Sequence, residues 1–186
     1  LLESGHHGNL WLDLELLCSR PGRLKPLIAE LSNRLSRLEV EAVCGALVEG
    51  AFIGLLTASQ MGVDFAYSER YEQKGEGGLF PVGYRVPDSL RSSVRQRRVA
   101  IVNDVINAGS AVRGTFDDLQ ACGSTVVAVG ALLVLGASAQ EFASRKGIAL
   151  ESIAAMPNEL WAESTCPLCA SGIALEDVAG FRTEWG

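Results

Sequence analysis

Two apolar segments set the narrowest limits on how this chain folds. The longer is residues 126–137, VVAVGALLVLGA, which holds no charged side chain. It is too short to cross a bilayer, which takes about 20 apolar residues, but it suits a strand buried on both faces. The other, residues 99–105, is apolar except for Asn103 and Asp104. Both segments therefore predict buried strands, and we expect no membrane partner.

Helical patterns alternate with such strands along the chain. Apolar residues at helical spacing, from Leu24 through Leu31 to Leu38, predict an amphipathic helix over 24–38. Further strands are predicted at 40–46, 63–67, 125–135 and 148–153, and further helices at 50–61, 110–121 and 140–146. Strands apolar on both faces that alternate with helices are typical of a parallel sheet covered on both sides. The predicted fold class is therefore α/β.

The two ends of the pattern define the expected domain. Residues 70–87 are rich in glycine and proline and predict a long loop or a hairpin. Periodicity fades near residue 157. We therefore predict one α/β domain over 1–156 and a C-terminal tail or flap over 157–186, which suits the usual domain size of roughly 150 residues.

The net charge and the cysteines indicate which classes of partner to expect and in which cellular compartment the protein acts. The chain has 16 Lys and Arg against 22 Asp and Glu, a net charge of −6 without a long run of like charge. Nucleic-acid binding rests on neutralising phosphates, so we expect no nucleic-acid partner. Five scattered cysteines favour reduced thiols over a disulfide framework, and the N-terminus lacks the basic region of a signal peptide. We expect a cytoplasmic protein.

The segment 99–113, VAIVNDVINAGSAVR, carries the clearest chemistry. Its strand leads through a short loop, 106–109, into a helix, and ligands of parallel sheets bind beyond the carboxyl ends of strands. Free N–H groups at the helix start, together with Gly109, suit an anion such as phosphate. The carboxylate of Asp104 can accept hydrogen bonds from ribose hydroxyls. The segment therefore predicts a sugar-phosphate site, unless Asn107 and its neighbours only cap the helix.

This segment resembles the phosphoribosyl diphosphate (PRPP) motif of the type I phosphoribosyltransferases, in the form found in orotate phosphoribosyltransferases. The family motif has four apolar residues, Asp-Asp-Val-Ile-Thr-Ala-Gly-Thr-Ala, and then two residues ending in Arg. Asn103, Asn107 and Ser110 replace the first Asp and the two Thr. The positions that match are Asp104, Val105, Ile106, Ala108, Gly109, Ala111 and Arg113.

The resemblance extends over residues 4 to about 137. Ser4 and Gly5, followed by Trp11 and Asp13, resemble the family's N-terminal hood. Residues 45–50, GALVEG, resemble its diphosphate loop, and Glu76–Gly78 falls where its mobile catalytic loop ends. The implied fold is a parallel sheet flanked by helices on both faces, with a small N-terminal hood segment and a C-terminal tail.

The implied activity is transfer of the phosphoribosyl group from PRPP to a nitrogenous base, most simply orotate, and the family acts as a homodimer. Mg²⁺ is expected to arrive bound to the substrate, without a dedicated metal cage in the protein. Catalytic roles are expected for Lys74 and Asp104, and base-binding roles for Arg113 and Asn107. PRPP contacts are expected from Asn103, Asp104, Val105, Ile106, Asn107, Ala108, Gly109, Ser110 and Ala111, and diphosphate contacts from Ala46, Leu47, Val48, Glu49, Gly50 and Arg70.

Two functional hypotheses remain open from the sequence. The first is an orotate phosphoribosyltransferase acting in pyrimidine nucleotide synthesis, which Arg113 and Lys74 favour. The second is a regulatory or degenerate paralogue that binds PRPP with little transferase activity. It is favoured by Asn103, which replaces a carboxylate, and by Glu69, which places a negative charge where the family has a cation.

A second motif, Cys166-Pro-Leu-Cys169, lies in the predicted tail. Pro167 and the following Gly172 favour a structural turn. A zinc site would need four ligands, with His6, His7 or a partner subunit completing it. A redox pair is the third interpretation.

Overall fold

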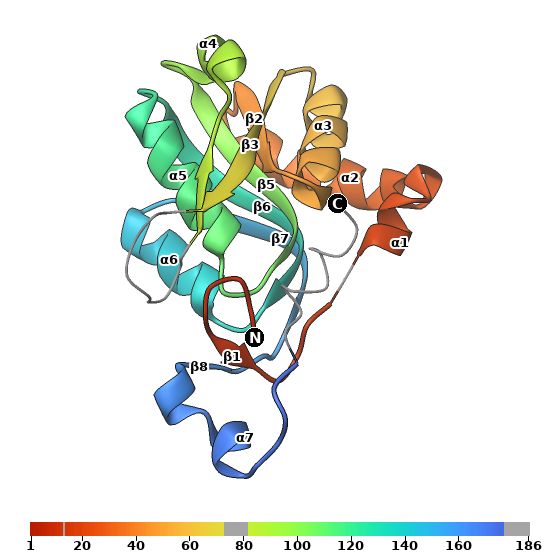
Figure 1. Ribbon diagram of the computed structural model, residues 1–186. Helices are drawn as coiled ribbons and strands as arrows, with labels where there is room; N and C mark the ends of the chain where they lie inside the picture. The colour runs from red at the N-terminus through yellow and green to blue at the C-terminus, as the bar shows by residue number, and fades with distance from the viewer. Residues whose placement is uncertain (13, 73–81, 177–186) are drawn as a thin grey trace.

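The computed structural model describes residues 1–12, 14–72 and 82–176 (Figure 1). At its centre is a six-stranded sheet with the order β4-β3-β2-β5-β6-β7. Neighbours among β2, β3, β5, β6 and β7 pair in parallel, whereas β4 runs antiparallel to β3 at the edge. The strands are β2 (Ala42–Ala46), β3 (Asp64–Glu72), β4 (Val82–Arg85), β5 (Arg98–Ile106), β6 (Thr125–Leu135) and β7 (Ala149–Met156).

Helices cover both faces of this sheet, as the sequence predicted. Figure 1 shows α1 (Glu15–Cys18), α2 (Pro21–Leu35) and α3 (Glu49–Met61) on one side and α5 (Ser110–Ala121) and α6 (Ser138–Lys146) on the other. The short α4 (Arg91–Val94) precedes β5. The fold is the predicted α/β class.

Alternation along the strands divides the core into two layers. In β2, Val43 packs with the α2 and α3 cluster, whereas Ala42 and Cys44 pack with the α5 and α6 cluster. The predicted stripe on α2 is confirmed, because Leu31 and Leu35 have no exposed surface. Burial of each such side chain contributes about 2 kcal/mol to folding. Burial also raises the pKa of the Cys44 thiol, so this cysteine stays protonated.

The segment 70–87 is the main local departure from the expected elements. The strand predicted over 63–67 continues to Glu72 and pairs with β4, so the hairpin alternative is confirmed for the described ends. The pairing places the Tyr71 ring against Gly83, where an added Cβ would lie 2.4 Å from a ring carbon. Glycine therefore permits this pairing, although it reads in the sequence as a loop residue.

Smaller differences concern element ends. The helix predicted over 24–38 begins earlier, at Pro21, and its last turn is a 3-10 helix over Ser36–Leu38. Proline suits the first helical turn because its missing N–H would have no partner there. The weak strand predicted over 148–153 runs to Met156 as β7.

The N-terminal residues and the segment that follows β7 come together at one end of the sheet (Figure 1). We call residues 1–12 the hood and residues 157–176 the C-terminal segment. In the hood, β1 (His7–Gly8) pairs antiparallel with β8 (Leu160–Trp161) of the C-terminal segment. Beyond β8 lie a 3-10 turn (Glu163–Thr165) and α7 (Pro167–Ala170). The first part of the predicted tail is thus attached to the hood. Across the described part of the chain, every helix is too short or too polar to pass through a bilayer.

Candidate active site

Two adjoining cavities lie at the carboxyl ends of β2 and β5. Their volumes are about 160 Å³ and about 310 Å³, and Trp11, Asn103 and Asn107 line both. The smaller is also lined by the loop 46–50, and the larger by residues 105–112. The motif and the loop predicted to hold PRPP therefore meet around one hollow, where ligands bind in parallel sheets.

The larger cavity contains the start of α5. Gly109, the residue before this helix, has φ +83° and ψ +27°, a left-handed conformation that glycine adopts readily. No side chain caps the helix there. The first N–H groups of α5 therefore remain available to an anion, and the helix dipole favours negative charge at this end.

The smaller cavity contains the start of α3, which also has no side-chain cap. Two glycines allow the chain to pack closely here. A Cβ on Gly45 would lie 2.4 Å from the carbonyl oxygen of Gly50, and a Cβ on Gly50 would lie 1.9 Å from Oδ1 of Asn103. The peptide bond between Leu47 and Val48 is cis. Adjacent parallel strands thus each lead into an uncapped helix start.

Polar side chains of β5 lie between these two helix starts. The strand runs to Ile106, so Asn103 and Asp104 lie within it rather than at its end. Nδ2 of Asn103 donates a 2.9 Å hydrogen bond to the carbonyl oxygen of Val105. Asp104 lines the smaller cavity together with Glu49, which is 8% exposed. The hollow therefore offers backbone N–H groups at two helix starts, the carboxylate of Asp104 on β5, and the carboxylate of Glu49 in the first turn of α3.

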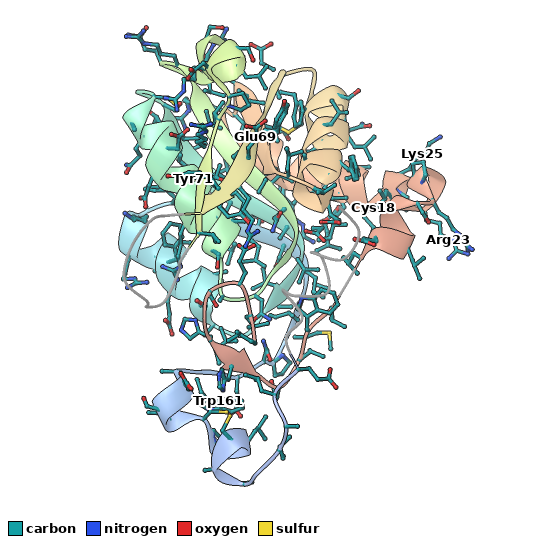
Figure 2. The ribbon with its side chains drawn as sticks, in the orientation of Figure 1. Cys18, Arg23, Lys25, Glu69, Tyr71 and Trp161 are labelled. Carbon is teal, nitrogen blue, oxygen red and sulfur yellow. The ribbon has the colours of Figure 1, made fainter. Side chains whose placement is uncertain are left out.

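Arg70 brings a cation to the larger cavity. It lies on β3, and its Nε is 3.0 Å from a carboxylate oxygen of Glu3 in the hood. The hydroxyl of Tyr84 donates a 2.8 Å hydrogen bond to the other oxygen of Glu3. Neighbouring residues of a strand point to opposite faces, so Glu69, labelled in Figure 2, points away from the face that carries Arg70. The reversed charge noted in the sequence thus lies on the other face of β3.

Asn107 joins the motif to both chain ends. Its Nδ2 donates a 3.3 Å hydrogen bond to the carbonyl oxygen of Leu10 in the hood. Its Oδ1 accepts a 2.8 Å hydrogen bond from Asn158 of the C-terminal segment. Sequence reasoning found Asn107 through the motif, but it missed Glu3, Tyr84 and Asn158, which belong to no local pattern. Only the fold brings them to the site.

Arg113, on α5, is not among the residues that line the two cavities; its side chain contacts Ala108 in the turn 106–109 and Ser138 of α6. Its guanidinium carbon is 4.8 Å from the centre of the Phe142 ring, and Nη2 donates a 3.2 Å hydrogen bond to Oγ of Ser138. Burial, reinforced by the nearby Arg145, lowers the pKa of Arg113. A side chain held in this way presents a fixed cation next to the motif.

The predicted catalytic lysine, Lys74, lies outside the described residues, as do Glu76–Gly78 and Asp13. The remaining predicted PRPP and diphosphate residues are described, and they border the hollow or form the turns that enter it. Two uncapped helix starts with the Asp104 carboxylate near them would suit a ligand that carries phosphate at two ends and hydroxyl groups in the middle.

Comparisons with known proteins identify chains of similar sequence. No protein-family model matches the chain. The orotate phosphoribosyltransferase of Caldanaerobacter subterraneus is 24% identical over 94% of this chain and 85% of its own length. That of Carboxydothermus hydrogenoformans is 28% identical over 92% and 84%, respectively.

Solved structures give the same fold. The orotate phosphoribosyltransferase of Aeropyrum pernix has a TM-score of 0.62 at 23% identity, with 78% of each chain covered. The sequence of this chain is similar to orotate phosphoribosyltransferases and its fold to type I phosphoribosyltransferases, which supports a phosphoribosyltransferase enzyme. The adenine phosphoribosyltransferase of Thermoanaerobacter pseudethanolicus has a TM-score of 0.63 at 15% identity, with 78% of this chain and 88% of that chain covered. The comparisons support phosphoribosyl transfer, while the bases named for these phosphoribosyltransferases differ.

Proposed function

We propose that this phosphoribosyltransferase transfers the phosphoribosyl group of PRPP to orotate, giving orotidine 5′-phosphate and diphosphate in pyrimidine nucleotide synthesis. The observation that carries the proposal is the pair of uncapped helix starts, of α3 and α5, at the ends of adjacent parallel strands. Orotate is favoured over other bases because the curated relatives that match nearly the whole chain are named for it.

Each part of PRPP has a proposed partner. The 5′-phosphate binds the turn and first N–H groups of α5, from Asn107 to Ala111, where Gly109 lets the backbone approach closely. The diphosphate binds the loop 46–50 and Arg70. The carboxylate of Asp104 accepts hydrogen bonds from the ribose hydroxyls, with Asn103 beside it. These contacts hold the anomeric carbon in the hollow between the two helix starts.

The proposed chemistry needs positioning, charge stabilisation and exclusion of water. The bond from the anomeric carbon to diphosphate breaks as a ring nitrogen of the base forms its bond there. The bonding electrons leave with diphosphate, and the proton of that ring nitrogen passes to the diphosphate or to solvent. Cationic groups and aligned N–H groups stabilise the charge that develops on the leaving group. The hood, which lines both cavities through Trp11, restricts water at the reacting carbon. Lys74 remains the proposed catalytic lysine.

Mg²⁺ is proposed to bind together with PRPP. Glu49 and Asp104 line one cavity and supply the carboxylate oxygens that Mg²⁺ prefers, so the residues present fit a cation carried by diphosphate. When bound, the ion would neutralise charge on the departing diphosphate.

The base is proposed to bind near Arg113 and Asn107. A planar guanidinium suits the carboxylate of orotate, because two parallel N–H groups can meet its two oxygens. We also propose a homodimer, as the family resemblance implies; the mass of the protein in solution tests this.

The experiment is a screen of diphosphate release. The protein is mixed with PRPP and Mg²⁺ and then with orotate, uracil, adenine or nicotinate. Release with orotate alone supports the proposal. Release with adenine alone would show that adenine, not orotate, is the acceptor base. PRPP binding without release for any base would instead indicate the regulatory paralogue, for which the comparisons give no support.

The matched variants for this screen are Asp104→Asn and Asp117→Asn. Each removes one negative charge without changing side-chain size, but Asp117 is exposed on α5, away from the cavities. Loss of turnover in the first variant alone ties the activity to the hollow.

A further inference from the structure

Three metal-binding side chains meet where the hood joins the C-terminal segment. His7, Cys166 and Cys169 each place one ligand atom within 4.8 Å of the other two. Nδ1 of His7 is 3.1 Å from Sγ of Cys169. Among the described residues, no other group of three or more histidine, cysteine or acidic side chains has its ligand atoms close enough to share one metal ion. It lies apart from the proposed PRPP site, whose cavities it does not line.

We propose that His7, Cys166 and Cys169 bind a zinc ion that fastens the hood to the C-terminal segment. Thiolate and imidazole are the ligands zinc prefers, and a C-x-x-C spacing at a turn brings two sulfurs toward one ion. Zinc bonds of about 2.3 Å to sulfur and about 2.0 Å to nitrogen, at tetrahedral angles, separate ligand atoms by roughly 3.5–3.8 Å. Side-chain adjustments of about 1 Å therefore bring the three atoms to these separations.

The backbone holds the three ligands in place before any metal arrives. His7 lies in β1, opposite Trp161 of β8, which Figure 2 labels at this junction. Cys166 precedes α7 and Cys169 lies within it, so one turn of chain carries both sulfurs. His7 and Cys166 are buried, at 5% and 4% exposed, whereas Cys169 is exposed. A structural turn alone would not require a histidine from the other end of the chain at these sulfurs.

The fourth zinc ligand comes from outside this trio. All three side chains line a third cavity of about 220 Å³, between the hood and residues 173–176. A water molecule in that cavity would complete a tetrahedral site.

Zinc bound by these three residues holds the hood against the C-terminal segment. The hood and C-terminal segment are otherwise joined by the two-residue β1–β8 pairing and by contacts such as the 3.3 Å hydrogen bond from the N–H of Glu159 to Oδ1 of Asn9. Asn158, next to Glu159, donates to Asn107 of the PRPP motif. The metal therefore stabilises a junction that adjoins the proposed active site, but its binding does not depend on the proposed function.

The test is metal content of the whole chain, purified without a metal-affinity column and measured by plasma mass spectrometry. Wild type is expected to hold one zinc per chain. Cys169→Ser and His7→Ala are expected to hold almost none. His6→Ala, which changes the neighbouring histidine, and Cys122→Ser, which changes a cysteine on the α5 side of the sheet, are expected to keep it.

Cobalt substitution gives a second, independent readout. The wild-type protein loaded with Co²⁺ is expected to show thiolate-to-cobalt charge transfer and the visible bands of tetrahedral cobalt. Cys169→Ser and His7→Ala, given the same amount of Co²⁺, should lose most of both signals. Thermal unfolding in chelator, which should be alike for wild type and Cys169→Ser, shows that the variant folds.

Three results would overturn the proposal. The first is wild-type protein that neither contains zinc nor takes it up. The second is unchanged zinc content in both His7→Ala and Cys169→Ser. The third is one zinc per two chains, which would place the site between copies instead of within one. If the first result is found together with a reversible Cys166–Cys169 disulfide, the redox interpretation replaces the zinc site.

Discussion

Replacing Gly109 with alanine tests the claim that the start of α5 binds phosphate. Gly109 has φ +83°, and a Cβ there would meet its nearest atom at 3.7 Å, so the substitution causes backbone strain without a clash. Gly123, just beyond the other end of α5, is its match: φ is +81° and a Cβ would meet nothing within 4 Å. A left-handed alanine costs about 1–2 kcal/mol at either place.

The two variants should therefore lose similar stability and differ in binding. For a chain of this length, that cost lowers Tm by roughly 2–8 °C in both. Only Gly109→Ala places a methyl group where the phosphate approaches the backbone. We expect its Kd for PRPP to rise at least about tenfold, equivalent to about 1.4 kcal/mol, with Gly123→Ala unchanged.

The assay pairs thermal unfolding with calorimetric titration of PRPP in Mg²⁺. Equal Kd values for the two variants, with equal loss of Tm, would refute the reasoning, because strain alone would then account for everything. A large Kd change in Gly123→Ala would refute it as well.

The remaining predictions concern the ribose contact, the base contact and the packing of β2. Asp104→Asn should raise the Kd for PRPP at least about tenfold, since hydrogen bonds to a charged group are worth about 1.5–3 kcal/mol; the same Kd as Asp117→Asn would contradict this. Arg113→Ala should raise KM for orotate by roughly 10- to 100-fold with little change in KM for PRPP, whereas equal changes in steady-state kinetics would remove Arg113 from the base site. Gly45→Ala should lower the free energy of unfolding by at least about 1–3 kcal/mol in urea denaturation, because its Cβ would lie 2.4 Å from the backbone of α3. A Cβ on Gly22 would have no atom within 4 Å, so Gly22→Ala should leave the free energy of unfolding unchanged or slightly raised. Equal stability of the two variants would show that the backbone of α3 can shift away from the added methyl group at little cost.

Local periodicity predicted most of the fold. Helix α2 has apolar residues at helical spacing, and strands β5 and β6 are apolar on both faces. These patterns made the type and the approximate bounds of the three elements predictable. The sequence does not distinguish the hairpin of β3 and β4 from a long loop, because glycines that permit close strand pairing look like loop residues in isolation.

The site was predictable only where it is local. The motif around Asp104 and Gly109 lies in one stretch of chain, and the residues that line the hollow there follow from it. Glu3 and Asn158 reach the site from opposite ends of the chain, and His7 reaches Cys169 across the β1–β8 pairing. Contacts of that span leave no periodic trace, and a two-residue strand is too short to show one.

The central claim is that the starts of α3 and α5 bind the two phosphate-bearing ends of PRPP. A crystal structure of the protein with PRPP and Mg²⁺ tests it most directly. We expect density for the 5′-phosphate against Asn107–Ala111 and for the diphosphate against residues 46–50, with the ribose hydroxyls at Asp104. PRPP bound away from both helix starts, or with its ribose hydroxyls far from Asp104, would contradict it.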